Sequence, residues 1–317
     1  MDAIRGRFAP SPTGELHLGS AWTALLAWLQ VRAAGGTMVL RIEDIDPERS
    51  RSFYTAALMA DMQWLGLDWD EGPDTGGPFA PYCQSQRRHL FEEALQYLAE
   101  AGLVYPCYCT RGELASLAPH GTEGERPYPG KCRGRNAQEV GGRKPSLRLI
   151  VPQETIAFRD GVKGVFAQDI AAAAGDFIVR RSDGVHAYQL AVVVDDAAMQ
   201  ITHVLRGEDL LDSTPRQILL YRLLGLTPPV FAHVPLLVAA DGHRLSKRQR
   251  DLSLASLRAH GARPENIIGY LAWKAGFLDV FSPMPAADLV PEFDLARIAK
   301  GPVIIGDDAA ACSGADI

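Results

Sequence analysis

The sequence predicts an α/β protein with a parallel sheet of the nucleotide-binding type, interrupted by an insertion. Three observations predict it. Residues 4–9 are expected to form an apolar strand, residues 18–34 a helix and residues 37–42 a second strand, an order typical of parallel sheets. The same alternation returns over residues 200–237. Between the two stretches, short strands and a cysteine cluster predict an inserted α+β subdomain.

Length, composition and charge are those of a globular protein. The chain has 317 residues, 47% hydrophobic and 22% charged, enough for two domains or one domain with an insertion. Its formal charge of −6 excludes a uniformly basic nucleic-acid coat but permits a local basic face. The N-terminus has no apolar signal-peptide region, and no apolar run reaches the ~18–20 residues of a membrane span. We therefore expect a cytoplasmic protein without membrane contact.

A Pro/Gly turn over residues 10–14 joins the first strand to the first helix. The first backbone N–H groups of a helix have no internal partner, so a strand, a turn and a helix N-terminus together form a candidate anion site. His17 can donate a hydrogen bond to a phosphate oxygen there, and Gly19 lets the backbone approach a ring or phosphate. The alternative interpretation is a Pro-rich loop that only joins the two elements.

The second strand ends in acidic residues, among them Glu43, Asp44 and Asp46. Carboxylates at the carboxyl edge of a parallel strand lie where such sheets bind ligands, so Glu43 is a candidate ligand. Asp46 and Pro47 instead predict the start of the next helix. Helix capping and solvation are the alternative roles for these acids. Helices are expected at 50–65 and 86–101, separated by a loop rich in Gly and Pro.

Three of the five cysteines lie close together in the sequence and predict a metal site in a reducing compartment rather than a disulfide framework. They are Cys107, Cys109 and Cys132, and zinc prefers a tetrahedral shell of sulfur and nitrogen ligands. Both His120 and Tyr128 are available as the fourth ligand. The alternative is a set of ordinary buried cysteines. The other two cysteines are Cys83 and Cys312.

The window 126–148 holds seven basic residues and one acidic residue, a local charge of +6 in a chain of net charge −6. This asymmetry predicts a surface for a phosphate backbone, and a solvated loop face is an equally good explanation. The basic residues are Arg126, Lys131, Arg133, Arg135, Arg143, Lys144 and Arg148.

The rest of the chain completes the sheet and adds a C-terminal part. Short strands are expected over 146–181, and the apolar run 188–196 predicts a buried strand, with a helix as the alternative. A strand at 200–205, a helix at 213–223 and a final strand at 230–237 then follow, before helices at 253–259 and 264–275; no periodicity is evident after Lys300. The expected parts are 1–106 and 200–250 for the sheet domain, 107–199 for the insertion and 251–317 for a small helical C-terminal domain.

Five motifs together resemble the class I aminoacyl-tRNA synthetases. His17-Leu18-Gly19-Ser20 is similar to their HIGH signature and Arg244-Leu245-Ser246-Lys247-Arg248 to their KMSKS signature. Segments 7–14, 41–44 and 206–209 resemble the glutamyl-tRNA synthetases specifically. The likeness covers about residues 4–275 and implies the Rossmann-type class I fold. Ser20 replaces the second histidine of HIGH, and Arg244 and Arg248 replace the outer Lys and Ser of KMSKS.

Only 70 residues follow Lys247, too few for the anticodon-reading domain of a glutamyl-tRNA synthetase. The chain therefore resembles the short paralogues of that family, the glutamyl-Q tRNA(Asp) synthetases, and Val192 stands where full-length enzymes tend to have Asn. The resemblance implies ATP-dependent activation of L-glutamate without tRNA and glutamyl transfer to queuosine at the wobble position of tRNA-Asp. The alternatives are a truncated enzyme that charges the 3′ end of tRNA-Glu, and an inactive relative that only binds tRNA.

The resemblance also implies site residues and partners. A Lys in a basic loop can neutralise charge on pyrophosphate oxygens, and guanidinium groups pair with carboxylates, so Arg7 and Arg206 are expected to clamp glutamate. Glu43 is expected to bind its ammonium group, and Tyr188 to donate a hydroxyl. Magnesium accompanies ATP, one structural zinc ion is expected, and the protein is expected to be a monomer. The full expected set is His17 and Lys247 as catalytic residues; His17, Gly19 and Lys247 for ATP; Arg7, Phe8, Ala9, Pro10, Ser11, Glu43, Tyr188 and Arg206 for L-glutamate; and Cys107, Cys109, Tyr128 and Cys132 for zinc.

Overall fold

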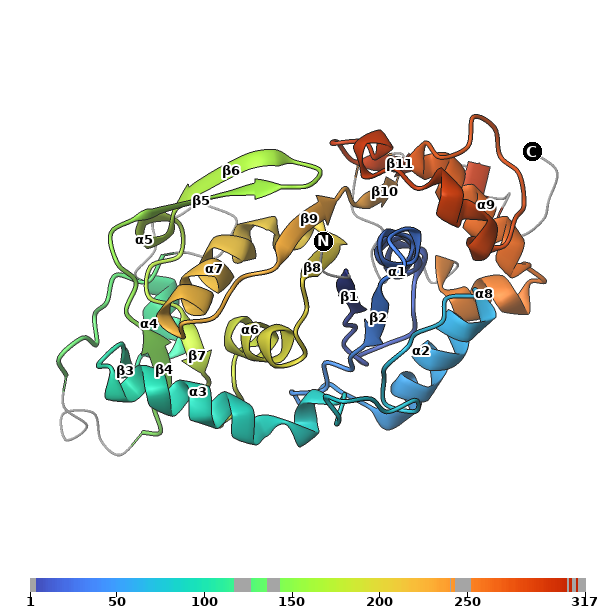
Figure 1. The fold of residues 1–317 in the computed structure, drawn as a ribbon. Coiled ribbons are helices and arrows are strands. Elements are labelled where there is room, and N and C mark those ends of the chain that lie inside the picture. The colour runs from blue at the N-terminus through green and yellow to red at the C-terminus, as the bar shows by residue number, and fades with distance from the viewer. Residues whose placement is uncertain are drawn as a thin grey trace.

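Four parallel strands form the central sheet of the computed structural model, which describes residues 4–116, 127–135, 143–239, 241–242, 252–306, 308–309 and 312. Their order is β2-β1-β8-β9, so β1 pairs with a strand that follows it by almost 200 residues, in the register Gly6 to His203. The predicted parallel sheet, resumed after an insertion, is confirmed (Figure 1). The strands are β1 (Arg5–Phe8), β2 (Thr37–Leu40), β8 (His203–Gly207) and β9 (Val230–Val234).

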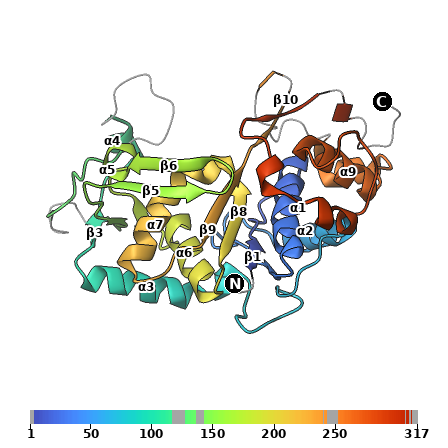
Figure 2. The same ribbon diagram turned by 45° about the horizontal axis from the view of Figure 1, so that its top comes forward.

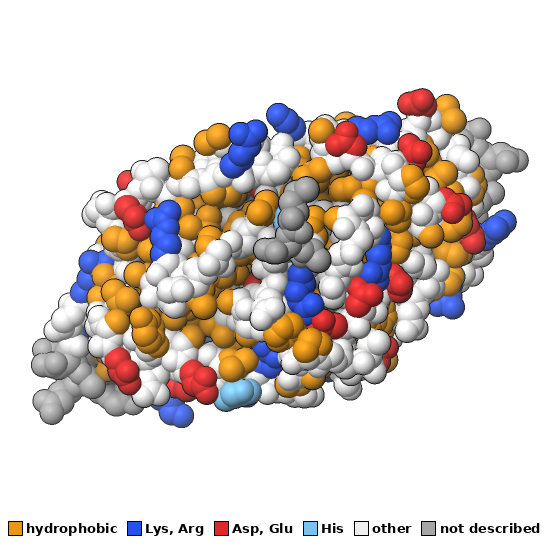
Figure 3. Space-filling model, viewed as in Figure 1, with side chains coloured by type: hydrophobic (Ala, Val, Ile, Leu, Met, Phe, Trp, Pro, Cys, Tyr) orange, Lys and Arg blue, Asp and Glu red, His pale blue; other side chains and the backbone are white. Residues whose placement is uncertain are grey.

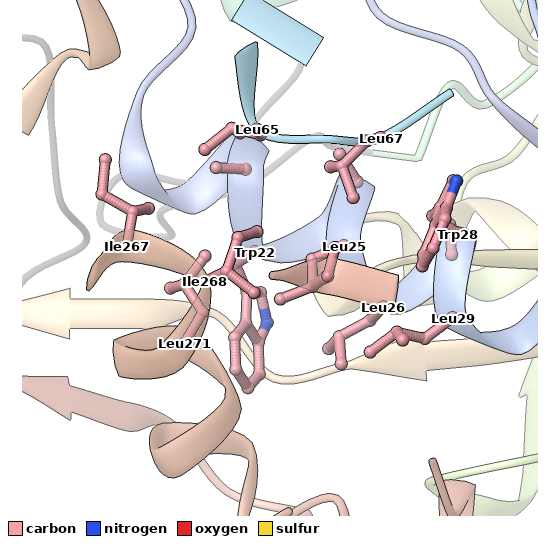
Figure 4. Packing of buried hydrophobic residues seen from close by; sticks show 14 of the residues in the cluster. Trp22, Leu25, Leu26, Trp28, Leu29, Leu65, Leu67, Ile267, Ile268 and Leu271 are labelled. Atoms are coloured by element: carbon pink, nitrogen blue, oxygen red, sulfur yellow. The ribbon is translucent and has the colours of Figure 1, made fainter. Parts of the chain in front are cut away.

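Helix α1 (Leu18–Ala33) connects β1 to β2 and lies in the larger hydrophobic cluster, because ten of its 16 residues are buried. Its Trp22 packs close to Ile268 and Leu271 of α9 (Figure 4) and donates a hydrogen bond from Nε1 to the carbonyl of Pro235 at 2.9 Å. The C-terminal helices α8 (Leu254–Ala259) and α9 (Pro264–Ala275), predicted from the sequence, thus share one core with α1.

Helices α3 (Arg88–Glu100), α6 (Tyr188–Ala198) and α7 (Thr214–Leu223) belong to a second hydrophobic cluster. The expected helices at 50–65, 86–101 and 213–223 are present, although the first begins at Ser52 rather than at Pro47. Asp46 instead accepts a hydrogen bond from the backbone N–H of Glu48 at 3.1 Å and forms a turn there. These helices are α2 (Ser52–Trp64), α3 (Arg88–Glu100) and α7 (Thr214–Leu223), with the 3-10 turns η1 (Gln84–Gln86) and η3 (Glu208–Ser213).

The strand predicted over 188–196 is wrong, because this segment forms the helix α6 (Tyr188–Ala198). Seven consecutive residues of α6, from Leu190 to Asp196, are buried. A helix enclosed on every side carries no polar face, so its sequence has the continuous apolar run of a buried strand. The helical alternative is the correct one.

The insertion between β2 and β8 contains two small antiparallel sheets and lies opposite the C-terminal helices (Figures 1 and 2). The short strands predicted over 146–181 are confirmed, and the turn expected at Asp160 joins the two strands of a hairpin. One sheet has the order β3-β4-β7 and the other is the hairpin β5-β6. The elements are β3 (Val104–Cys107), α4 (Arg111–Ser116), β4 (Ser146–Leu149), β5 (Thr155–Asp160), β6 (Gly164–Asp169), α5 (Ile170–Ala173) and β7 (Ile178–Arg180).

The expected final strand over 230–237 is wrong in its extent. β9 ends at Val234, and β10 (Leu237–Ala239) belongs to a separate two-stranded sheet with β11 (Val303–Ile305), which the sequence did not indicate. Pro235 lacks the N–H group that would continue the ladder of β9. Two 3-10 segments, η5 (Ala286–Glu292) and η6 (Leu295–Arg297), precede β11. No helix in the described ranges has both the length and the apolar character needed to cross a membrane.

Candidate active site

A cleft of about 1540 Å³ extends from the carboxyl ends of β1 and β2 to the insertion. Open parallel sheets bind ligands at this edge. Ser11 and Glu43 line the cleft on the side of the sheet, Tyr188 and Gln189 line it at the start of α6, and Arg148 and Phe177 line it on the side of the insertion.

A buried network of charges lies at the inner end of the cleft and centres on Asp196 of α6. Its carboxylate accepts hydrogen bonds from Arg7 Nε at 3.2 Å and from Arg41 Nη1 at 2.6 Å. Arg41 also donates from Nη2 to Glu43 at 3.1 Å. Burial disfavours the charged form of Arg41, but Asp196 and Glu43 together hold its pKa above the ordinary value. Arg41 and Asp196 thus stay ionised, and the network fixes the positions of Arg7 and Glu43.

Glu43 and Tyr188, both expected at the glutamate site, line the same cleft. Burial raises the pKa of the Glu43 carboxyl, although Arg41 and Arg7 act to lower it. Burial also raises the pKa of the Tyr188 phenol, and the charges of Arg206, Glu43 and Arg7 all act on it. Four of the predicted glutamate-site residues therefore lie within electrostatic reach of one another.

Arg206 is held on two of its three nitrogens. Its Nε donates to His233 Nε2 at 3.0 Å, and its Nη2 donates to Thr214 Oγ1 at 2.9 Å and to Gln217 Oε1 at 2.7 Å. The third nitrogen, Nη1, is buried and has no hydrogen-bond partner within the described part of the chain. Burial lowers the pKa of Arg206, and the nearby Tyr188 opposes this effect. A buried guanidinium with an unpaired N–H group is suited to bind a carboxylate.

Arg7 differs from Arg206, because Nε and Nη2 of Arg7 both donate to Asp196, at 3.2 to 3.4 Å. Phe8 ends β1 and Ala9 and Pro10 follow it toward the cleft, where the Pro10 carbonyl accepts a hydrogen bond from the backbone N–H of Glu43 at 2.9 Å. This backbone bond ties the turn after β1 to the segment after β2 and brings Ser11 to the cleft wall.

His17 is the residue before the first helical turn of α1, and its backbone pairs with Ser253 of the C-terminal part. A side chain added at Gly19 would meet no atom of the described residues within 4 Å, so among them the space above this turn is open. Lys247 and the rest of the KMSKS-like segment lie outside the described residues. Of the three residues expected to bind ATP, the structure describes His17 and Gly19.

The three clustered cysteines meet, as predicted, and could hold a metal ion. The Sγ atoms of Cys107, Cys109 and Cys132 lie within 4.8 Å of one another. The Tyr128 hydroxyl is 3.4 Å from Cys107 Sγ and 3.5 Å from Cys109 Sγ. Burial acts to raise the pKa of the Cys132 thiol, but hydrogen bonding with Tyr128 lowers it to about 7. Three sulfur donors around one point, with a phenol beside them, fit a zinc ion. His120 lies outside the described residues.

Several basic side chains of the window 126–148 are paired with other residues, so fewer positive charges are available than the sequence suggests. Arg133 donates from Nε to the buried Asp176 at 2.7 Å, and Arg148 donates to the Asp176 carbonyl at 2.6 Å and is itself buried. Arg143 lies 3.8 Å from Glu113. Other residues expose their charge to solvent, namely Lys131, Arg135 and Lys144. Basic and acidic side chains are interspersed on the face seen in Figure 3, without a continuous basic surface.

Sequence reasoning missed several residues that hold the site together. Asp196 was noticed only as the end of an apolar run, although an acid directly after buried residues is almost always paired. The sequence does not mark Asp160 or Thr214 as part of the site. Gln217 and His233 were not singled out, because their partner Arg206 is distant in the sequence.

The family model described as tRNA synthetases class I (E and Q), catalytic domain, matches residues 3–278. The chain is 55% identical to the glutamyl-Q tRNA(Asp) synthetase of Symbiobacterium thermophilum, covering 98% of both chains. It is 51% identical to that of Nitratidesulfovibrio vulgaris, covering 96% of each. Its fold matches the crystal structure of a glutamate tRNA ligase from Elizabethkingia meningosepticum in complex with its amino acid, with a TM-score of 0.85 and 30% identity; it covers 98% of this chain and 68% of that one.

Proposed function

The chain belongs to the class I tRNA synthetases of the E and Q type, and from this premise we propose that it activates L-glutamate with ATP without tRNA. The glutamyl group is then transferred to queuosine at the wobble position of tRNA-Asp. The observation that carries the first step is the buried Arg206 guanidinium with its unpaired Nη1. For the acceptor, support comes from full-length similarity to proteins named glutamyl-Q tRNA(Asp) synthetase.

In the proposed glutamate site, Nη1 of Arg206 donates a hydrogen bond to one carboxylate of the substrate. Glu43 faces the ammonium group of the substrate, and the Tyr188 hydroxyl donates a hydrogen bond to the substrate. Arg7 adds a second positive charge, which Asp196 holds in place. Burial makes each of these interactions stronger than it would be in water. The remaining proposed contacts come from the end of β1 and the segment after it, that is from Phe8, Ala9, Pro10 and Ser11.

In the proposed reaction the α-carboxylate oxygen of glutamate attacks the α-phosphorus of ATP and pyrophosphate leaves with its magnesium ion. No covalent bond to the protein is required, so the chain contributes positioning and electrostatic stabilisation. His17 and Lys247 are proposed to contact the phosphates. The open space above Gly19 is proposed to accommodate ATP, next to the positive end of the α1 dipole.

For the metal we propose a structural zinc ion held by Cys107, Cys109, Cys132 and Tyr128. Zinc bound there would link β3 to the turn that carries Cys132 and stabilise the fold of the insertion. The site is separate from the residues proposed for glutamate, so no chemical step involves it.

We further propose the division of the chain at residues 106, 199 and 250, a monomeric state and a cytoplasmic location. The proposed tRNA contact uses the exposed charges of the basic window. Two hypotheses compete with this function: a truncated synthetase that charges the 3′ end of tRNA-Glu, and an inactive relative that only binds tRNA.

Glutamate-dependent exchange of pyrophosphate into ATP, measured without tRNA, tests the first step. We expect exchange with L-glutamate and not with L-glutamine, because a side-chain amide cannot form the charge-assisted pair with a guanidinium that a carboxylate forms. Exchange with no amino acid at all would support the inactive relative instead.

A further inference from the structure

His233 of β9 is fully buried between two charged side chains. Its Nδ1 is 2.6 Å from Asp160 Oδ2, and its Nε2 is 3.0 Å from Arg206 Nε. Asp160 comes from the hairpin turn of the insertion and Arg206 from β8 of the central sheet. One imidazole therefore joins the insertion to the proposed glutamate site.

The hydrogen-bond partners determine the tautomer of this imidazole. Arginine carries only donors, so the Nε2 of His233 must offer a lone pair to Arg206 Nε–H. The proton is then on Nδ1 and is donated to Asp160 Oδ2. Burial lowers the pKa of His233, although the hydrogen bond to Asp160 acts to raise it. The imidazole is therefore neutral, with one donor and one acceptor in fixed directions.

Asp160 is itself held in one orientation. Its Oδ1 accepts three backbone N–H groups, from Val162 at 3.0 Å, Lys163 at 2.8 Å and His233 at 3.1 Å. This leaves Oδ2 for the imidazole alone. Its pKa is lowered despite burial, chiefly by the bond to His233 and by these backbone groups, so it remains a carboxylate.

We propose that Asp160 and His233 are positioning residues that fix Arg206 for glutamate through the tautomer of the imidazole. With Nε bound by His233 and Nη2 by Thr214 and Gln217, the guanidinium cannot rotate, and Nη1 alone is left for a substrate carboxylate. This deepens the function proposed above and rests on it. Neither residue needs to touch the substrate.

The substitution Asp160→Asn tests the tautomer directly. The three backbone N–H groups keep the amide oxygen at the Oδ1 position, so the NH₂ group faces Nδ1 of His233. The imidazole must then carry its proton on Nε2, where it can reach Thr214 Oγ1 but no longer accepts from Arg206. We expect the KM for glutamate in pyrophosphate exchange to rise at least ~10-fold, the scale of a lost bond to a charged group. The KM for ATP should stay within ~2-fold, because Arg206 is not among the residues proposed to bind ATP.

The matched control is His233→Gln, which places an amide oxygen near the Nε2 position without a tautomer to be set. In this background Asp160→Asn should change the KM for glutamate by less than ~2-fold, so the two substitutions are strongly coupled. An equal rise in both backgrounds would show that Asp160 acts only through the hairpin, and no rise in either would show that the tautomer does not matter. Both results overturn the proposal. Unchanged thermal midpoints would show that the fold is intact.

The unaltered protein separates this inference from the function on which it rests. Exchange with glutamate by the unaltered protein, together with an unchanged KM in Asp160→Asn, contradicts the positioning role alone. No exchange with glutamate by the unaltered protein contradicts the proposed function, and the positioning role with it.

Discussion

Asp196 and Arg7 form a buried ion pair across 189 residues of sequence, with Oδ1 and Nε 3.2 Å apart. The pair joins helix α6 to strand β1, and the same carboxylate also binds Arg41. Because two buried arginines share one anion, the position of Arg7 at the proposed glutamate site depends on a residue of α6.

We therefore predict that Asp196→Asn raises the KM for glutamate at least ~10-fold, because removing one partner of a buried charge pair leaves the other uncompensated. Steady-state pyrophosphate exchange measures it. Asp195 provides the matched control, since it is equally buried but its hydrogen bonds go to Arg87 at 2.6 Å and Gln84 at 2.9 Å, and it only lies 3.9 Å from Arg41 Nε. Asp195→Asn should lower the thermal midpoint and leave that KM within ~3-fold. A similar KM change in both variants would contradict the assignment.

The proposed role of Lys247 predicts that Lys247→Ala lowers the rate of glutamate-dependent pyrophosphate exchange at least ~100-fold, the scale of one preorganised charge contact in a transition state. The exposed Lys131 serves as control, and Lys131→Ala should leave exchange unchanged. Near-normal exchange in Lys247→Ala would remove Lys247 from the mechanism.

The metal proposal predicts one zinc ion per chain by elemental analysis of the freshly purified protein. Cys132→Ser removes a ligand, so zinc should fall well below one ion per chain and the thermal midpoint should fall with it. Exchange should remain within ~3-fold, because the metal is structural. Cys83→Ser should keep the zinc. Metal-free protein with three titratable thiols at Cys107, Cys109 and Cys132 would contradict the site.

The RNA-contact proposal predicts a variant that separates the two half-reactions. Reversing Lys131, Arg135 and Lys144 to Glu should weaken transfer to tRNA-Asp at least ~10-fold and reduce its salt dependence, since each neutralised phosphate contributes a log–log slope of about −0.7 to −0.9. Pyrophosphate exchange should not change. Arg133 is left intact, because its bond to Asp176 supports the insertion.

The same charge reversal at Arg263, Arg297 and Lys300, which are exposed in the C-terminal part, controls for net charge. If both triple variants transfer glutamate normally at physiological salt, the basic window is a solvated loop and tRNA binds elsewhere.

The central sheet could be predicted because its signals are local. The strands are short runs that alternate with helices and turns along the chain, and Gly35 and Gly36 follow the end of α1. Helix α6 could not be predicted with certainty, because burial on all sides removes the polar face that marks a helix. Strand β11 has three residues and depends on pairing with β10, which no local pattern encodes.

Residues of the candidate site, too, could be predicted only where a local motif marks them. Arg7, Glu43, Tyr188 and Arg206 were predicted from their motifs, and the three cysteines from their spacing. Asp196, His233 and Asp160 were not, because each acts on a partner that lies far away in the sequence. The partner of Arg133 was missed for the same reason, so the free charge of the basic window was overestimated.

Acceptor identity tests the central claim most directly. Labelled glutamate and ATP are supplied with the purified protein and, separately, with tRNA-Asp containing queuosine, tRNA-Asp lacking it, and tRNA-Glu. We predict label on queuosine-containing tRNA-Asp alone, with none on tRNA-Asp that lacks queuosine and none on tRNA-Glu. Label on the 3′ end of tRNA-Glu, with none on tRNA-Asp, would contradict the account and identify the protein as a short glutamate–tRNA ligase.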